Sequence, residues 1–163
     1  MLCAEREHTA CFSGHRIIPA ETHSQLSALL VTAVDSLVAA GVTSFICGGA
    51  IGFDTMAAQT VLAAREQNPD VRLILALPCK DQSNRWPAKD VAQYVEHIAL
   101  ADEVHWISET YTSDCMHRRN RFMVDHAAIV VTYCTRPRGG TAQTIAYAER
   151  QGIRHISLHK PSA

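Results

Sequence analysis

The sequence has no excess of positive charge and contains few aromatic residues. Its 163 residues include 15 Lys and Arg against 16 Asp and Glu, which gives a net charge of -1, and only 6% are Phe, Trp or Tyr. Proteins that bind duplex DNA by charge alone have a strongly basic balance. The composition therefore disfavours a dedicated duplex-DNA binder and counts against nucleic acid as a partner.

Long hydrophobic runs are also missing. The first ten residues contain no apolar core of a signal peptide, and the most hydrophobic stretch, Leu26 to Val42, is interrupted by polar residues and by Gly41. We therefore expect no signal peptide, no membrane span and a cytoplasmic location.

The six cysteines include no CxxC pair. Structural zinc sites and disulfide frameworks depend on regular Cys or His spacing, and the one metal-like pair here, His155 and His159, falls on a predicted strand and the tail behind it. We therefore expect most of the cysteines to be reduced core thiols, and we expect neither a metal site nor a cofactor.

Short apolar runs rich in β-branched residues alternate with longer stretches of helical period along the whole chain. The predicted strands are Thr9–Ser13, Thr43–Cys47, Val71–Leu77, Glu103–Ile107, Ala127–Thr132 and Arg154–Leu158. The predicted helices are Thr22–Ala40, Phe53–Gln67, Ala88–Ala101, Ser113–His126 and Thr141–Gln151. Several strands are apolar at consecutive positions, as expected when helices cover both faces of a sheet. We predict an α/β fold with three layers, a doubly wound and mostly parallel Rossmann-like sheet, in one domain over residues 1–163.

Positive charge gathers in the loops that follow the predicted strands, where such folds bind ligands. Of the 15 cationic residues, 12 are arginine, and 8 lie in or just after these loops. Arginine favours planar recognition of phosphate or carboxylate, so the loops indicate an anionic ligand. For Arg118 and Arg121, however, a solvated position on the outer face of a helix is the preferred interpretation.

The first of two glycine loops, Gly48-Gly49-Ala50-Ile51-Gly52-Phe53-Asp54, joins a strand to a helix. Gly48, Gly49 and Gly52 could let backbone amides approach a phosphate at the helix N-terminus. The segment matches neither the Rossmann fingerprint nor the Walker loop. The structural alternative is a tight turn in which Asp54 offsets the helix dipole, since a carboxylate repels phosphate unless it binds a sugar hydroxyl.

The second glycine loop also follows a strand and opens a helix. Gly139, Gly140 and Thr141 come after Arg136 and Arg138, and Thr141 could cap the helix or donate its hydroxyl to a phosphate. Two such junctions in one small α/β domain favour phosphate binding.

Arg119 is predicted to emerge from the middle of an apolar stripe on its helix, so its charge needs a partner. That partner is either a core carboxylate, Asp125 or Asp102, or a ligand anion, and we favour the ligand. Asn120 beside it offers an amide suited to a base edge or a ribose.

Two further segments carry candidate residues. Ser13, Gly14, His15 and Arg16 follow the first strand, where His15 could be an acid or base or simply a surface histidine. Trp86, in the loop between Lys80 and Pro87, could stack on a base or pin its loop to the domain.

The segments FSGHR, GGAIGFD, MHRRNRFMV and GGTAQTIAYAERQG, in this order, resemble the SLOG superfamily, which includes the Smf/DprA and LOG proteins. The similarity extends from about Ala10 to Ser157 and is strongest to the YspA/YpsA-like branch of small proteins. The resemblance implies a Rossmann-like sheet that binds a nucleotide or a nucleotide-derived ligand at the glycine loops.

The resemblance to LOG enzymes, which cleave a nucleoside monophosphate to base and ribose phosphate, is partial. Met116, Arg119 and Met123 match the M-x-x-R-K-x-x-M helix of those enzymes, with Asn120 in place of the lysine. Gly139, Gly140 and Thr141 match the end of the P-G-G-x-G-T-x-x-E loop. Thr144 takes the position of the glutamate, and a threonine cannot replace the carboxylate that the chemistry needs.

Three functions compete on these grounds. The leading hypothesis is a binder, or sensor, of a small phosphorylated ligand such as ADP-ribose or a nucleoside monophosphate. The second is a phosphoribohydrolase or N-glycosidase that uses Arg119 with Asp54 or another carboxylate. The third is single-stranded nucleic-acid binding, against which the charge balance and the sparse aromatics count. The sequence does not decide between a monomer and a homo-oligomer.

Overall fold

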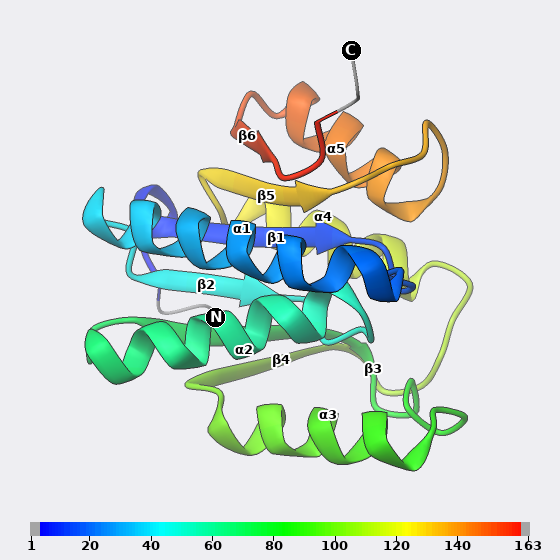
Figure 1. The fold of residues 1–163 in the computed structure, drawn as a ribbon. Helices are drawn as coiled ribbons and strands as arrows, with labels where there is room; N and C mark the ends of the chain where they lie inside the picture. The colour runs from blue at the N-terminus through cyan, green and yellow to red at the C-terminus, as the bar shows by residue number, and fades with distance from the viewer. Residues whose placement is uncertain (1–3, 161–163) are drawn as a thin grey trace.

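The computed structural model describes residues 4–160, in which six parallel strands form one sheet (Figure 1). The strand order is β4-β3-β2-β1-β5-β6, and every pairing in it is parallel. The strands are β1 (Thr9–Gly14), β2 (Ser44–Cys47), β3 (Arg72–Cys79), β4 (Glu103–Ser108), β5 (Ile129–Tyr133) and β6 (Arg154–Ser157). The predicted α/β, doubly wound, Rossmann-like fold is confirmed.

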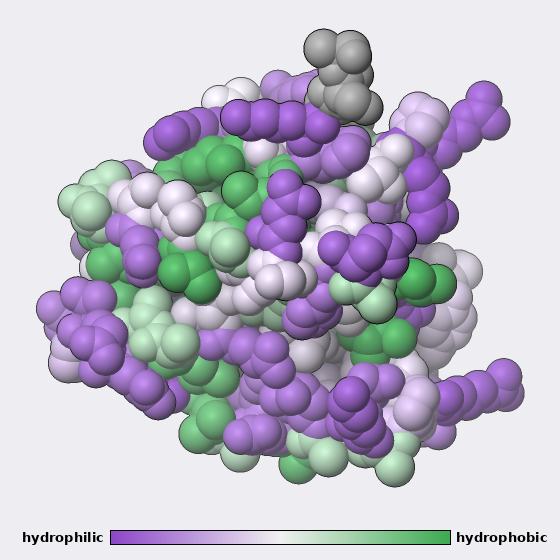
Figure 2. All heavy atoms as spheres, in the orientation of Figure 1, coloured by the Kyte–Doolittle hydropathy of each residue, from purple (hydrophilic) through white to green (hydrophobic). Residues whose placement is uncertain are grey.

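Helices cover both faces of the sheet and make the three predicted layers. On one face lie α1 (Ala20–Ala39), α2 (Phe53–Gln67) and α3 (Ala88–Leu100), seen in front in Figure 1. On the other lie α4 (Cys115–Asp125) and α5 (Gly140–Arg150). A short 3-10 helix, Arg6–His8, precedes β1. Figure 2 shows that hydrophilic side chains cover much of the outer surface on the α1–α3 side.

The two cores follow from the alternation of side chains along buried strands. Phe12 of β1 and Phe45 of β2 pack toward α1 and α2, whereas their neighbours Cys11 and Ile46 pack toward Met123 of α4. Both sets are fully buried, which explains why the strand sequences are apolar without alternation. No helix in residues 4–160 is long and apolar enough to cross a membrane.

The helix and strand boundaries lie within two residues of the predicted ones. Strand β3 runs past its predicted end and includes Pro78. Its pairing with β2 ends at Leu75, so beyond that point β3 pairs with β4 alone, and the missing N–H of a proline is tolerated on the unpaired side.

Four of the cysteines, at positions 11, 47, 79 and 115, are buried free thiols, as expected. Cys134 is free but only partly buried, and Cys3 lies outside the described residues.

The end of β1 is held against the start of α2. The Phe53 N–H donates to the carbonyl oxygen of His15 at 3.0 Å, and Phe53 is fully buried. A Cβ on Gly14 would overlap the Phe53 ring. This close approach places the loop after β1 directly beside the loop after β2.

We expect Gly14→Ala to lower the free energy of unfolding by about 1–3 kcal/mol, because the added methyl group must displace the buried Phe53 ring. Gly140→Ala is the matched control, since no atom lies within 4 Å of a Cβ at that position, and it should change stability by less than about 1 kcal/mol. Chemical denaturation of both variants measures the difference. Equal stability of the two would show that β1 and α2 are not in close contact.

Candidate functional site

A crevice of about 400 Å³ lies at the carboxyl edge of the sheet, beside the end of β1 and below the loop between β5 and α5. Strand order reverses there, because β1 is flanked by β2 on one side and β5 on the other. The predicted site residues in its wall are Ser13, Gly14, His15, Arg16, Asp54, Arg119, Asn120, Gly139, Gly140 and Thr141. Gly48, Gly49 and Gly52, also predicted, do not line it.

Arg119 lies at the floor of the crevice and is only 7% exposed. Its Nη1 donates to the carbonyl oxygen of Gly48, and its Nε donates to Oδ1 of Asn120 at 2.8 Å. Within residues 4–160, the hydrogen-bond partner of its Nη2 is the sulfur of Met116, at 3.8 Å. A thioether is a weak acceptor, so Nη2 keeps strong donor capacity at the crevice.

The carboxylate that balances Arg119 is Asp54 on α2. Arg119 Nη1 and Asp54 Oδ2 would lie 2.6 and 2.8 Å from a Cβ at Gly48, so the two side chains converge on that glycine. The two core carboxylates named as the alternative to a ligand, Asp102 and Asp125, have other partners. Asp102 forms an ion pair with Arg65 at 2.8 Å, and Asp125 accepts a hydrogen bond from the Tyr147 hydroxyl at 2.6 Å.

Burial dominates the electrostatics of this pair. It raises the pKa of Asp54 above the ordinary value of 3.8, against the opposing effects of Arg119, the Ala50 N–H and Arg16. It lowers the pKa of Arg119, against the charge of Asp54. The crevice floor therefore presents a guanidinium and a carboxyl that both lie away from bulk water.

The first glycine loop is closed by the protein's own groups. The Ala50 N–H donates to Asp54 Oδ2 at 3.2 Å, and the Phe53 N–H donates to the His15 carbonyl oxygen. Gly52 has a φ of 83° and packs against the backbone carbonyl of Arg16. The structural alternative for this loop, a tight turn around Asp54, describes the geometry.

The second glycine loop is open. Gly139, with a φ of 110°, precedes the first residue of α5, and residues 4–160 provide no hydrogen-bond acceptor for the backbone N–H groups of Gly140 and Thr141. These donors lie in the crevice wall with Arg136 and Arg138. An anion can therefore be bound at the start of α5 without displacing a protein group.

His15 joins the two loops that flank the crevice. Its Nε2 accepts a hydrogen bond from the Thr135 N–H at 2.8 Å, and its ring lies edge-on to Tyr133. Burial, followed by the charges of Arg136 and His159, lowers the pKa of His15 from the ordinary value of 6.5. These contacts tie the loop after β1 to the loop after β5.

Several residues of the crevice were not among the predicted site residues. Phe12, Met116 and Met123 are apolar lining residues, and Ile17 and Ala50 complete the wall. Arg136 and Arg138 stand beside the second glycine loop, and their position next to Gly139 was the signal that could have identified them. Arg118 and Arg121 are exposed on the outer side of α4, as predicted.

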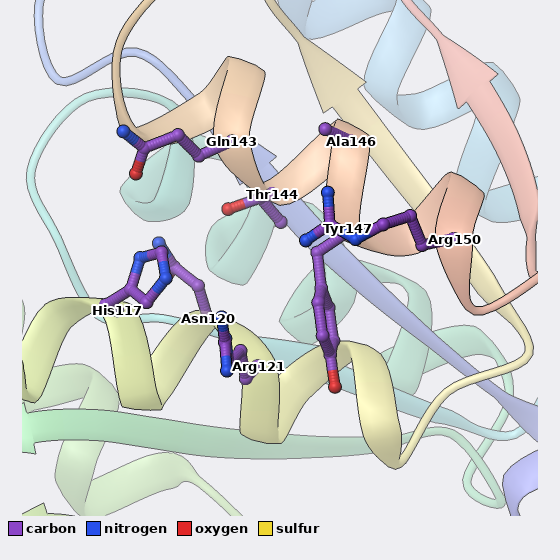
Figure 3. A pocket seen from close by; sticks show the side chains of 8 residues that line it. All are labelled: His117, Asn120, Arg121, Gln143, Thr144, Ala146, Tyr147 and Arg150. Carbon is purple, nitrogen blue, oxygen red and sulfur yellow. The ribbon is translucent and has the colours of Figure 1, made fainter.

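Thr144 lies outside the crevice wall. It is 5% exposed, and its hydroxyl donates to the Gly140 carbonyl oxygen at 3.0 Å within the first turns of α5. It lines a smaller hollow of about 140 Å³ between α4 and α5, shown in Figure 3. Asn120 is the residue that lines both this hollow and the crevice.

No group of three His, Cys, Asp or Glu side chains among the described residues is arranged to hold a metal ion. The expectation that the site works without a metal or cofactor stays a prediction.

Two comparisons with known sequences give related proteins. Residues 20–156 match the YspA SLOG family. The SPbeta prophage-derived protein YoqJ of Bacillus subtilis (strain 168), itself described as uncharacterized, is 28% identical over 123 residues, covering 68% of this chain and 72% of YoqJ.

Solved structures with a similar fold include two DNA processing proteins A (DprA). The Streptococcus pneumoniae protein has a TM-score of 0.67 at 16% identity. The match covers 96% of this chain and 51% of the Streptococcus pneumoniae protein. The Helicobacter pylori protein, which binds single-stranded DNA, has a TM-score of 0.68 at 16% identity, over 94% of this chain and 66% of that one. TM1055, a structural-genomics target, has a TM-score of 0.58 at 17% identity, over 90% of this chain and 71% of TM1055. The TM-scores show that these proteins share the fold.

We expect the His15 ring to titrate below pH 6.5, because protonation would turn its Nε2 from an acceptor into a donor facing the Thr135 N–H. A histidine whose pKa is lowered on folding contributes stability that is complete above pH 6.5 and is lost as the pH falls. Histidine NMR titration measures the midpoint, and the Thr135 amide signal should shift with it. A midpoint at or above 6.5 would show that His15 Nε2 does not accept the hydrogen bond from the Thr135 N–H.

Proposed function

Since the chain belongs to the YspA SLOG family, we propose that its crevice binds a nucleotide or a nucleotide-derived phosphorylated ligand, such as ADP-ribose or a nucleoside monophosphate. The ligand's phosphate takes the open start of α5 and the uncommitted side of Arg119. Its sugar lies near Asp54 and Asn120, whose side chains suit hydroxyl groups. Such binding serves a sensing role.

One observation carries this proposal. The guanidinium of Arg119 is buried, and within residues 4–160 its Nη2 donates only to the thioether of Met116. A buried cation with spare donors is costly unless something binds them, and a phosphate oxygen is the strongest acceptor available. The N–H groups of Gly140 and Thr141 lie in the same wall and have no acceptor in the described part of the chain, so they favour the same anion.

Asp54 favours a second candidate, an N-glycosidase or phosphoribohydrolase. Its carboxyl is 6% exposed, lines the crevice and has a raised pKa. A carboxyl of this kind can donate a proton to a leaving base or stabilise positive charge on a ribose. Asp54 is also committed to the Ala50 N–H and to Arg119, which is why we rank binding first.

Isothermal titration calorimetry against nucleoside monophosphates and ADP-ribose, with and without a chelator, tests the proposed function. We expect binding that the chelator does not change. A short single-stranded oligonucleotide belongs in the panel because the Helicobacter pylori protein binds a ligand of that kind. No binding of any nucleotide, or binding of the oligonucleotide alone, would refute the proposal.

We expect Arg119→Lys to weaken nucleotide binding by roughly 10- to 100-fold, the effect of losing a charge-assisted, forked contact. A lysine keeps the charge but cannot bond Gly48, Asn120 and a phosphate together. Arg118→Lys, on the exposed outer side of the same helix and outside the crevice wall, is the control and should change the dissociation constant about twofold or less. Normal binding by Arg119→Lys together with a lowered melting temperature would make Arg119 purely structural.

Hydrolysis of nucleoside monophosphates should be far slower than about one turnover per second, because Thr144 takes the place of a carboxylate. Thr144→Glu should raise the rate of base release, whereas Gln143→Glu, which puts the same charge on an exposed neighbouring position, should not. Chromatographic detection of free base measures both. Rapid hydrolysis by the natural protein that Asp54→Asn abolishes would establish the second candidate instead.

A further inference from the structure

A second cavity adjoins the crevice at the carboxyl edge of the sheet. We call it the Trp86 cleft. It has a volume of about 810 Å³ and is bounded by the loop between β3 and α3, by the loops after β1, β2 and β4, and by the start of α4. Arg16, Ile17 and Met116 line both the cleft and the crevice. A ligand held at Arg119 can therefore extend into the cleft past these three residues.

Aromatic side chains supply flat surfaces in the cleft. Trp86 is held in place by an edge-to-face contact with the buried Tyr94, with ring centroids 5.1 Å apart. The Arg16 guanidinium lies 6.0 Å from the centre of the Trp86 ring, so a planar cation already faces it. Tyr111, at the mouth, is 64% exposed. Rings presented in this way bind other flat groups by stacking.

Two of the polar atoms at the cleft are buried hydrogen-bond acceptors without a donor, although Arg16, Asn84 and Arg85 also line it. Asp81 Oδ1 and Gln82 Oε1 are shielded from solvent and have no hydrogen-bond partner within residues 4–160. Gln82 donates through Nε2 to the Tyr94 hydroxyl at 3.0 Å, and Oε1 is the end of its amide that has no partner within residues 4–160. A buried acceptor without a donor is unfavourable, so these oxygens favour a ligand that brings N–H groups.

We propose that the Trp86 cleft is the base-binding half of the site and that it selects bases carrying an exocyclic amino group. This inference rests on the proposed function, because it requires the phosphate end of the ligand at Arg119. The base stacks on Trp86 and Tyr111, and its amino group donates to Asp81 or Gln82. A base with a carbonyl oxygen at the same position would place two acceptors against each other.

The chain provides its own reporter for this arrangement, because it contains only two tryptophans, Trp86 and Trp106. Trp106 lies on β4 near Lys80 and does not line the cleft. In the Trp106→Phe variant, all tryptophan fluorescence comes from Trp86. We expect AMP and CMP to quench it and ribose 5-phosphate to bind without quenching.

Calorimetry on the same protein measures base selection with ligand pairs that differ in one amino group. AMP should bind about tenfold or more tightly than IMP, and CMP should bind more tightly than UMP by a similar factor. Tyr111→Ala should weaken AMP binding by roughly tenfold and leave ribose 5-phosphate unchanged, since the exposed Tyr111 ring touches only the base. Val95→Ala, an exposed apolar position on α3, is the control and should alter neither ligand.

The outcomes separate this inference from the function on which it rests. If ribose 5-phosphate binds as tightly as AMP, and AMP does not quench Trp86, the base does not bind in the Trp86 cleft. The proposal that a phosphate binds at Arg119 is unaffected by that result. Equal affinities within both base pairs overturn the amino-group selection. Absence of binding by every phosphorylated ligand refutes the proposed function, and the base-binding cleft is refuted with it.

Discussion

The burial of one positive charge is the constraint on which the site depends. Arg119 of α4 reaches across the sheet edge to the carbonyl of Gly48, at the end of β2, and lies beside Asp54 of α2. A guanidinium so far from water is tolerated only where partners are fixed around it. The three elements are thereby held in one arrangement, and a Cβ at position 48 would overlap the ends of both charged side chains and displace at least one of them.

The two glycine loops show how one sequence signal can serve two purposes. Both follow a buried strand and open a helix. Before α2, the Ala50 N–H donates to Asp54 and the Phe53 N–H donates to the His15 carbonyl oxygen, whereas before α5 no acceptor within residues 4–160 meets the N–H groups of Gly140 and Thr141. The difference comes from the loop after β1, which packs onto Gly52 and has no counterpart at Gly139. An anion site needs both a helix start and the absence of a competing neighbour.

The sequence was sufficient to predict the fold because each strand is buried between two helical layers and each helix is amphipathic. It was also sufficient to predict that Ser13, Asp54, Arg119 and Thr141 lie at one edge of the sheet, because the carboxyl ends of parallel strands lie at the same edge. It named Arg119 and Asp54 together only as residues of a catalytic site. It did not predict that Asp54 balances the buried charge of Arg119, because that contact depends on how α2 and α4 meet across the end of β2. The sequence did not decide whether Trp86 anchors its loop to the domain or faces a ligand. In the structure the Trp86 ring packs on Tyr94 and also lines a cleft.

The position of β1 in the middle of the sheet determines when the crevice can exist during synthesis. One edge of β1 pairs with β2, which follows after a single helix, but the other edge pairs with β5, which begins only at Ile129. A nascent chain therefore carries β1 with one edge unpaired until β5 has left the ribosome. The contact between His15 and Thr135 forms only after that pairing, so the crevice cannot bind a ligand before β5 and the loop behind it have been synthesised.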